Sequence, residues 1–278
     1  MIHADLALAR RHERAASAIE SEYARSHAAI RPGFDVAAVP IADGVAIFAG
    51  ANSPMSQATG LGMDGPITEA DLEALEAVYH SRGAAAKIVV CPLADDSLFL
   101  RLNQRGYRLA EFEQVMVRAL DDDASPPHDS GIEITAIGRE EDDRYMAAVG
   151  PNFTEDGILT PDLREMMEAS LRMRCATSFL AACGGVDAGG GSLLIHEGLA
   201  MLAGASTLPA FRNRGVQAAL LDARLRVARE VGCDLAVIGA KPGSGSQRNA
   251  ERNGFRVAYT KVVMTREPGW VSHSILAS

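Results

Sequence analysis

Residues 206–221 read STLPAFRNRGVQAALL and join the end of an apolar run to a basic turn and the start of a helix. A helix is predicted by apolar residues at helical spacing, at Val216, Ala219, Leu220, Ala223 and Val227. Gly232 is expected to end it, and Arg224, Arg226 and Arg229 are expected on its other faces. Free N–H groups in a helix's first turn attract anions, and glycine lets a ligand approach the backbone. The stretch predicts an anion site at Gly215, with a turn that only caps the helix as the alternative.

The residues around this turn alternate between strand and helix patterns. In chain order we expect a strand at 131–137, two helices within 140–174 broken near Gly150, strands at 177–183, 192–196 and 199–207, the helix after Gly215, a strand at 235–239, a short helix at 246–252 and a last strand at 255–266. The glycine cluster 184–191 and the turn His196-Glu197-Gly198 are expected to separate the three middle strands. This order predicts an α/β fold with a mixed sheet.

A repeat links the two halves of the chain. Residues 106–118 align without gaps on residues 254–266, at an offset of 148, with six of thirteen positions identical. At the same offset the apolar run 87–91 meets 235–239. The repeat predicts two related domains in tandem, each a mixed, mostly antiparallel sheet with helices on both faces.

Domain boundaries follow from composition and length. The chain has 278 residues, enough for two ordinary domains, and its clearest break is the acidic and proline-containing stretch 121–130. We expect an N-terminal helical segment at 1–31, a first domain at 32–120, a linker at 121–130, a second domain at 131–270 and a tail at 271–278.

Charge and cysteine usage restrict the partners. A formal charge of -9 disfavours nucleic acid and anionic membrane. The sequence lacks an apolar run of membrane-spanning length and a secretory leader pattern, which predicts a cytoplasmic protein. The four cysteines have no metal-ligand spacing, so no metal site is expected, and Cys91 and Cys233 are expected to be buried.

The basic turn resembles the signature of the GNAT acetyltransferase superfamily, Q/R-x-x-G-x-G/A. Arg212 and Gly215 match it and Arg214 is also basic, whereas Gln217 stands where the family has glycine or alanine. Gly254-Phe255 is similar to the family's late glycine-aromatic pair, and residues 131–266 follow the family's order of elements. The resemblance implies a tandem GNAT protein that binds acetyl-CoA.

The resemblance also assigns cofactor-binding residues. The pantetheine arm is expected beside the strand end Ala205, Ser206 and Thr207, with N–H groups of residues 206–208 polarising the thioester. The diphosphate is expected on the turn formed by Arg212, Asn213, Arg214, Gly215, Val216, Gln217 and Ala218. Ser246 and Asn249 are expected to contact CoA, although Ser246 is equally expected to be the N-cap of a short helix.

The catalytic groups are less defined. Many relatives place an acidic tyrosine where this chain has Ala250, so Tyr259 becomes the nearest candidate acid. Candidate bases are Glu197 or His196 on the strand turn, and Glu155 or Asp156 near the helix break. The implied reaction is direct transfer of an acetyl group to the amine of a small molecule or a peptide. The alternative is a non-catalytic acyl-CoA-binding or regulatory module, and nucleotide binding is disfavoured because no P-loop lysine follows the glycine.

The first domain lacks the basic turn. At the 148-residue offset, residues 212–217 align with Asp64-Gly65-Pro66-Ile67-Thr68-Glu69, which has neither the arginine nor the aligned glycine. Glu69 and Asp71 would themselves satisfy the helix dipole and repel a diphosphate. We expect a degenerate GNAT-like domain without CoA, which supplies packing surface or a wall of the acceptor site.

Overall fold

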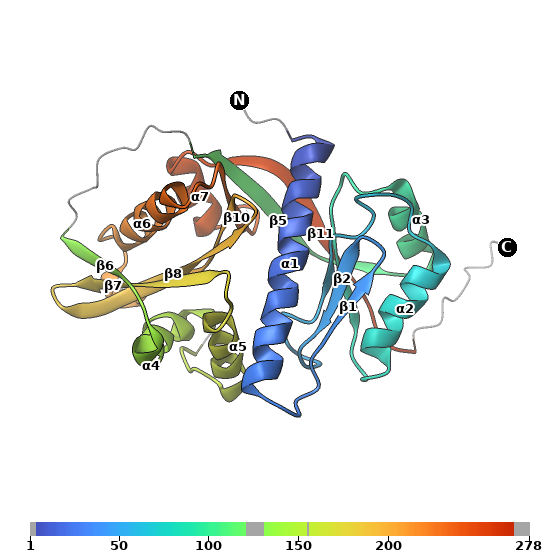
Figure 1. Cartoon of the computed structure of the whole chain (residues 1–278), viewed down its shortest axis with the longest axis horizontal. Coiled ribbons are helices and arrows are strands. Elements are labelled where there is room, and N and C mark those ends of the chain that lie inside the picture. The colour runs from blue at the N-terminus through green and yellow to red at the C-terminus, as the bar shows by residue number, and fades with distance from the viewer. Residues whose placement is uncertain (1–3, 121–130, 155, 270–278) are drawn as a thin grey trace. The chain divides into compact units, whose positions relative to one another are not determined.

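The computed structural model describes residues 4–120, 131–154 and 156–269 and divides into two compact units (Figure 1). Unit 1 contains the chain up to Gln114 together with the chain from Tyr259 onward, and unit 2 is Val115–Ala258. The divisions therefore fall inside two strands, β5 (Arg108–Ala119) and β11 (Arg256–Arg266). This differs from the expected second domain, 131–270, whose last strand largely belongs to unit 1. The expected linker, 121–130, lies outside the described residues.

Unit 2 follows the predicted order of elements. After the end of β5 it contains β6 (Ile132–Ala136), α4 (Asp142–Val149), α5 (Pro161–Leu171), β7 (Ala176–Cys183), β8 (Val186–His196), β9 (Leu199–Thr207), α6 (Val216–Glu230), β10 (Leu235–Ala240) and α7 (Gly245–Arg252). Strands β6 to β9 pair antiparallel in sequence, and β9 pairs parallel to β10. The mixed α/β fold is confirmed.

Glycines inside β8 correct the expectation that residues 184–191 only separate strands. Gly189, Gly190 and Gly191 lie within the strand. A Cβ atom on Gly190 would lie 2.8 Å from the Tyr145 ring of α4, and one on Gly191 would lie 3.0 Å from Nη1 of Arg224 on α6. Because successive strand residues point to opposite faces, α4 and α6 cover opposite faces of the sheet. Glycine is needed here for close packing and not for a turn.

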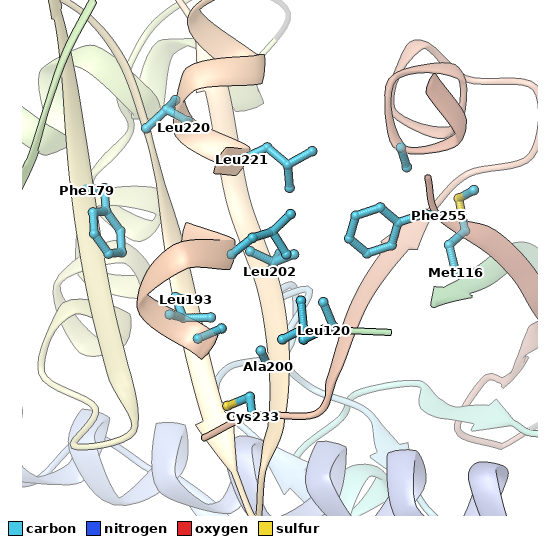
Figure 2. Close-up of a cluster of buried hydrophobic side chains, with 14 of the residues drawn as sticks. Met116, Leu120, Phe179, Leu193, Ala200, Leu202, Leu220, Leu221, Cys233 and Phe255 are labelled. Carbon is cyan, nitrogen blue, oxygen red and sulfur yellow. The ribbon is translucent and has the colours of Figure 1, made fainter. Parts of the chain in front are cut away.

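The main core of unit 2 lies between its sheet and α6 (Figure 2). Leu220, Leu221 and Leu225 project from α6 onto Leu193 and Leu202 of the sheet. Met116 and Leu120, from the end of β5, belong to the same cluster, and the Leu120 N–H donates to the Asp234 carbonyl at 2.9 Å. The last part of β5 is therefore built into unit 2, which is the physical reason for the displaced domain boundary.

Unit 1 repeats part of this pattern. It contains α1 (Leu6–Ile30), β1 (Ala37–Ile41), β2 (Gly44–Phe48), β3 (Ala58–Thr59), α2 (Glu69–His80), β4 (Ala86–Val90) and α3 (Asp96–Gln104), followed by the start of β5. Strand β11 pairs antiparallel with β4, from Val262 opposite Val90 to Arg266 opposite Ala86. An offset of 148 places α2 on α6, β4 on β10, α3 on α7 and β5 on β11, which agrees with the sequence repeat.

Unit 1 holds a buried polar cluster between α1 and β11. Lys261 Nζ lies 3.3 Å from Glu13 Oε1, and Tyr259 donates its hydroxyl to the same oxygen at 3.1 Å. Burial alone would raise the pKa of Glu13, but Lys261 and His12 outweigh it and lower that pKa to about 2. The ion pair ties the first helix of the chain to its last strand.

Two further sequence expectations concern buried and apolar segments. Cys91 and Cys233 are buried, as predicted. In the described part of the chain, no helix is both long and apolar enough to cross a bilayer.

Candidate functional site

A cleft opens where two parallel strands separate. β9 and β10 pair from Leu199 opposite Leu235 to Met201 opposite Val237, and the pairing goes no further. Beyond this point Leu202 and Ile238 line a cleft of about 790 Å³, whose other walls come from the first turn of α6 and from α7. Two strands that share a start and then diverge leave unpaired backbone edges, which suit an extended, amide-containing ligand.

One end of the cleft is a helix N-terminus without a protein cap. Gly215, the N-cap of α6, has φ +87°, a left-handed conformation that favours glycine, and no side chain caps the helix. The first turn carries no acidic residue, and Val216, Gln217 and Ala218 all line the cleft. Their N–H groups precede the first intrahelical partner, so they and the helix dipole are available to an anion.

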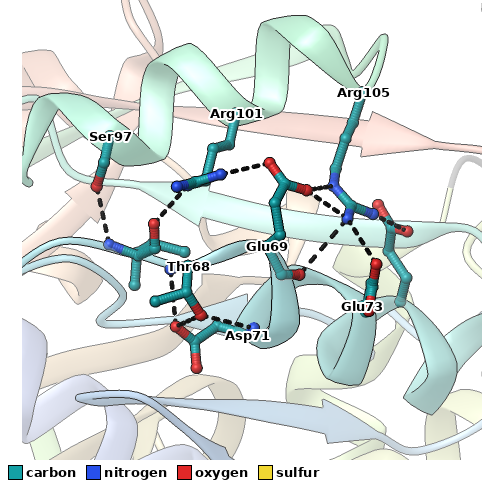
Figure 3. Close-up of polar contacts among 9 residues, drawn as sticks. Thr68, Glu69, Asp71, Glu73, Ser97, Arg101 and Arg105 are labelled. Atoms are coloured by element: carbon teal, nitrogen blue, oxygen red, sulfur yellow. Dashed lines mark hydrogen bonds and ion pairs between the residues drawn. The ribbon is translucent and has the colours of Figure 1, made fainter.

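The matching helix of unit 1 is capped by its own side chains (Figure 3). Thr68 accepts from the Asp71 N–H, and the Asp71 carboxylate accepts from the Thr68 N–H, which makes a capping box at the start of α2. Glu69 is paired with Arg101 and Arg105. The first turn of α2 is therefore occupied by carboxylates, as the sequence predicted, whereas the matching first turn of α6 has no side-chain cap.

Side-chain contacts hold Gln217, Arg212 and Arg214 of the α6 turn. Gln217 donates to Thr207 Oγ1 at 2.8 Å, so the residue that departs from the family signature holds the helix start against the end of β9. Arg212 donates to Asn152 Oδ1 at 3.3 Å, and Arg214 lies over the Phe211 ring at 5.5 Å from its centroid. The turn is preorganised before any ligand arrives.

Comparison with solved structures identifies the architecture. The GCN5-related N-acetyltransferase from Kribbella flavida matches with a TM-score of 0.63 and 19% identity over 89% of this chain and 96% of that one. The chain has the fold of the GNAT acetyltransferases. A tandem GNAT protein from the clavulanic acid biosynthesis pathway matches at TM-score 0.54 and 15% identity, over 72% and 69% of the two chains. The GCN5-related N-acetyltransferase from Sphaerobacter thermophilus matches at 0.52 and 20%, over 72% and 65%. No protein-family model and no curated sequence matches.

Almost all residues assigned to CoA from the GNAT resemblance lie on this cleft. They are Ala205, Ser206, Thr207, Arg212, Asn213, Gly215, Val216, Gln217, Ala218, Ser246 and Asn249, whereas Arg214 is not among the lining residues. Ser246 is not the N-cap of α7, because Ser244 fills that position and accepts from the Gln247 N–H at 3.1 Å. The expectation that Leu208 holds the thioester is also wrong, because its N–H donates to the Ala188 carbonyl at 2.9 Å.

Tyr259, Glu197, His196 and Asp156, the candidate acid and bases that the structure describes, do not line the cleft. Tyr259 is buried in unit 1 on Glu13 and His12, where burial raises the pKa of its phenol. Glu197 and His196 lie at the hairpin between β8 and β9, and Asp156 caps a loop at the Ile158 N–H. Glu155 lies outside the described residues. Ala250, at the position where the GNAT resemblance led us to look for a tyrosine, does line the cleft.

The structure adds residues that the sequence did not suggest. Arg224 lies on the buried face of α6 and lines the cleft, which corrects its expected placement on another face. The signal was its position four residues after Leu220, on the same helix face. Gly204, with φ +60°, and Ala205 form a bulge in β9 where the pairing with β8 shifts register. No group of three His, Cys, Asp or Glu residues in the described ranges is arranged to hold a metal ion.

Proposed function

We propose that the protein is an acyl-CoA-dependent N-acyltransferase that moves an acyl group, with acetyl as the smallest, to an amine in a ternary complex. The observation that carries this proposal is the cleft between β9 and β10 that ends on the uncapped first turn of α6. A diphosphate suits that turn because it needs several N–H donors, positive potential and close approach to the backbone.

The charge of the cleft supports an anionic cosubstrate. Of the described residues that line it, the titratable ones are Arg212, Arg224 and Arg252, and none is a carboxylate or an imidazole. Such a cationic cleft in a chain of formal charge -9 is a local feature, so it points to a specific anion and not to general electrostatic attraction. CoA would place its diphosphate on residues 212–218 and its pantetheine arm along Ala205, Ser206 and Thr207.

The chain contributes position and polarisation to the reaction. The bulge at Gly204 and Ala205 breaks the pairing with β8 and turns backbone toward the cleft, where an N–H group polarises the thioester carbonyl. The amine nitrogen attacks the carbonyl carbon as the C–S bond breaks, the amine loses a proton, and CoA leaves as the thiol. Holding both reactants in one cleft also lowers the barrier, because their entropy is lost on binding and not in the transition state.

Proton transfer relies on water because, among the described residues that line the cleft, there is no carboxylate, imidazole, phenol or thiol. Ala250 provides no hydroxyl that could protonate the departing thiolate. A thiolate is a good leaving group because its conjugate thiol is fairly acidic, so it can take its proton from water. The amine must then arrive neutral. We expect kcat/KM to rise with pH until the pKa of the acceptor's own amine is reached, a profile that changes when the acceptor changes.

The acceptor is proposed to be a small cationic amine or the amine of a peptide, since the negative net charge favours approach of cations. The alternative function, a non-catalytic acyl-CoA-binding module, is favoured by the same lack of an acid or base in the cleft. A panel of polyamines, aminoglycosides and peptides with acetyl-CoA, followed by thiol release and mass spectrometry, separates the two. Acylated product supports the enzyme, and tight acetyl-CoA binding without product on any amine supports the module.

A further inference from the structure

A buried arginine that is paired with no described carboxylate lies in the wall of the cleft. Arg224 is 3% exposed, and its guanidinium donates to the Leu220 carbonyl from Nε at 3.0 Å and to the Ser192 carbonyl from Nη1 at 3.3 Å. Among the described residues, no carboxylate pairs with it and no acceptor contacts Nη2. Burial lowers the pKa of Arg224 to about 10, so the side chain is still a cation at neutral pH.

The missing side chain of Gly191 leaves space in the sheet for this guanidinium. A Cβ atom on Gly191 of β8 would lie 3.0 Å from Nη1 of Arg224 and 3.1 Å from its Cζ, so a side chain at 191 would crowd the guanidinium. The same point is 3.1 Å from the Cβ of Ala205, in the bulge of β9. The missing side chain at Gly191 therefore places a positive charge beside the bulge.

Arg224 lies in the cleft well away from the proposed diphosphate turn. Arg224 lies eight residues beyond Val216 on α6, about 12 Å from the proposed diphosphate turn at 1.5 Å per residue. The pantetheine arm proposed above runs from that turn past Thr207 toward Ala205, which adjoins the guanidinium. The group that reaches Arg224 is thus the acyl end of the thioester. The apolar residues Leu202, Leu221 and Ile238 also line the cleft.

A buried cation is costly to maintain unless an anion pairs with it, and a guanidinium binds a carboxylate with two parallel hydrogen bonds. We propose that Arg224 recognises a carboxylate at the far end of the acyl group, so that the preferred donor is the CoA thioester of a short dicarboxylic acid. The proposal rests on the proposed function of the cleft and names its acyl group. In the reaction the C–S bond breaks and the C–N bond forms as before, and the distal carboxylate is unchanged.

Calorimetric binding of acetyl-CoA, malonyl-CoA and succinyl-CoA tests this without turnover. For the wild type we expect malonyl-CoA or succinyl-CoA to bind at least tenfold more tightly than acetyl-CoA. Arg224→Met should abolish that ratio, because a thioether cannot pair with the distal carboxylate. Arg224→Lys keeps the positive charge but cannot make two parallel hydrogen bonds to a carboxylate, so it should retain part of the ratio. It replaces the methionine variant in the test if that variant does not fold.

The matched control is Arg226→Met, the same change on the same helix at an exposed residue paired with Asp222. It should keep the full ratio. Equal affinity of the wild type for the three thioesters would overturn the proposal, and so would an unchanged affinity ratio in Arg224→Met. Arg224 would then have a structural role only. If acetyl-CoA binds and only discrimination is absent, the proposed function stands; if no thioester binds, both fail.

Discussion

Removing the cation of the buried ion pair in unit 1 should destabilise the protein strongly. Lys261 Nζ lies 3.3 Å from Glu13 Oε1 and 3.4 Å from Oε2, with side chains 5% and 1% exposed. Lys261→Met leaves a carboxylate buried without its partner, which costs about 3 to 5 kcal/mol. Glu13→Gln should cost a similar amount, because it leaves the ammonium group unpaired. The measurement is the free energy of unfolding at pH 7 from urea denaturation, followed by circular dichroism.

The double variant makes this prediction specific. With both charges removed, neither partner is left buried alone, so the loss should fall short of the sum of the single variants by at least about 2 kcal/mol. Additive losses, within about 0.5 kcal/mol, would show that the two groups do not depend on each other. The connection of the first helix to the last strand through this pair would then be refuted.

Three further predictions concern stability, pH and binding. Gly190→Ala places a Cβ 2.8 Å from the Phe179 carbonyl oxygen and should cost about 1 to 3 kcal/mol in thermal unfolding, whereas Gly245→Ala, with nothing within 4 Å, should stay within about 0.5 kcal/mol. Burial raises the pKa of Glu20 to about 7, so the folded state holds this proton more tightly than the unfolded state and stability falls as pH rises from 4.5 through 7; Glu20→Gln should remove that fall and be the more stable protein at pH 8. Arg212→Gln should weaken CoA binding about tenfold in calorimetry and reduce its salt dependence, whereas Arg226→Gln should not.

Local patterns were sufficient to predict most elements. The hairpin at Glu197 and Gly198, both with positive φ, and the end of α6 before Gly232 follow from residue types alone. The strands with which β5 and β11 pair do not follow from residue types. Residues 106–118 and 254–266 have nearly the same pattern, and which strand each one pairs with depends on contacts far away in the sequence, such as Lys261 with Glu13. The alternation of apolar residues identifies a strand but does not determine which strands it pairs with.

The site divides in the same way. The anion turn was predictable because glycine, arginines and an apolar helix stand next to one another in the sequence. Arg224 was not, because a charged residue on a helix is usually solvated, and its burial depends on the missing side chain of Gly191 on another element. Tyr259 was chosen by proximity in sequence to Gly254-Phe255, yet its strand carries it into unit 1. Chain distance is a poor guide to a cleft made from several elements.

Calorimetric titration of acetyl-CoA into the wild type, Gly215→Glu and Gly232→Glu shows whether the α6 turn binds the CoA diphosphate. Both glycines have left-handed φ, +87° and +84°, at opposite ends of α6, and a Cβ at either meets no atom closer than 3.7 Å. Each variant should therefore fold with a comparable penalty of about 1 to 2 kcal/mol. We expect binding to the wild type and to Gly232→Glu, and at least hundredfold weaker binding to Gly215→Glu. Equal binding by Gly215→Glu, or none by the wild type, would mean that the diphosphate does not lie on this turn.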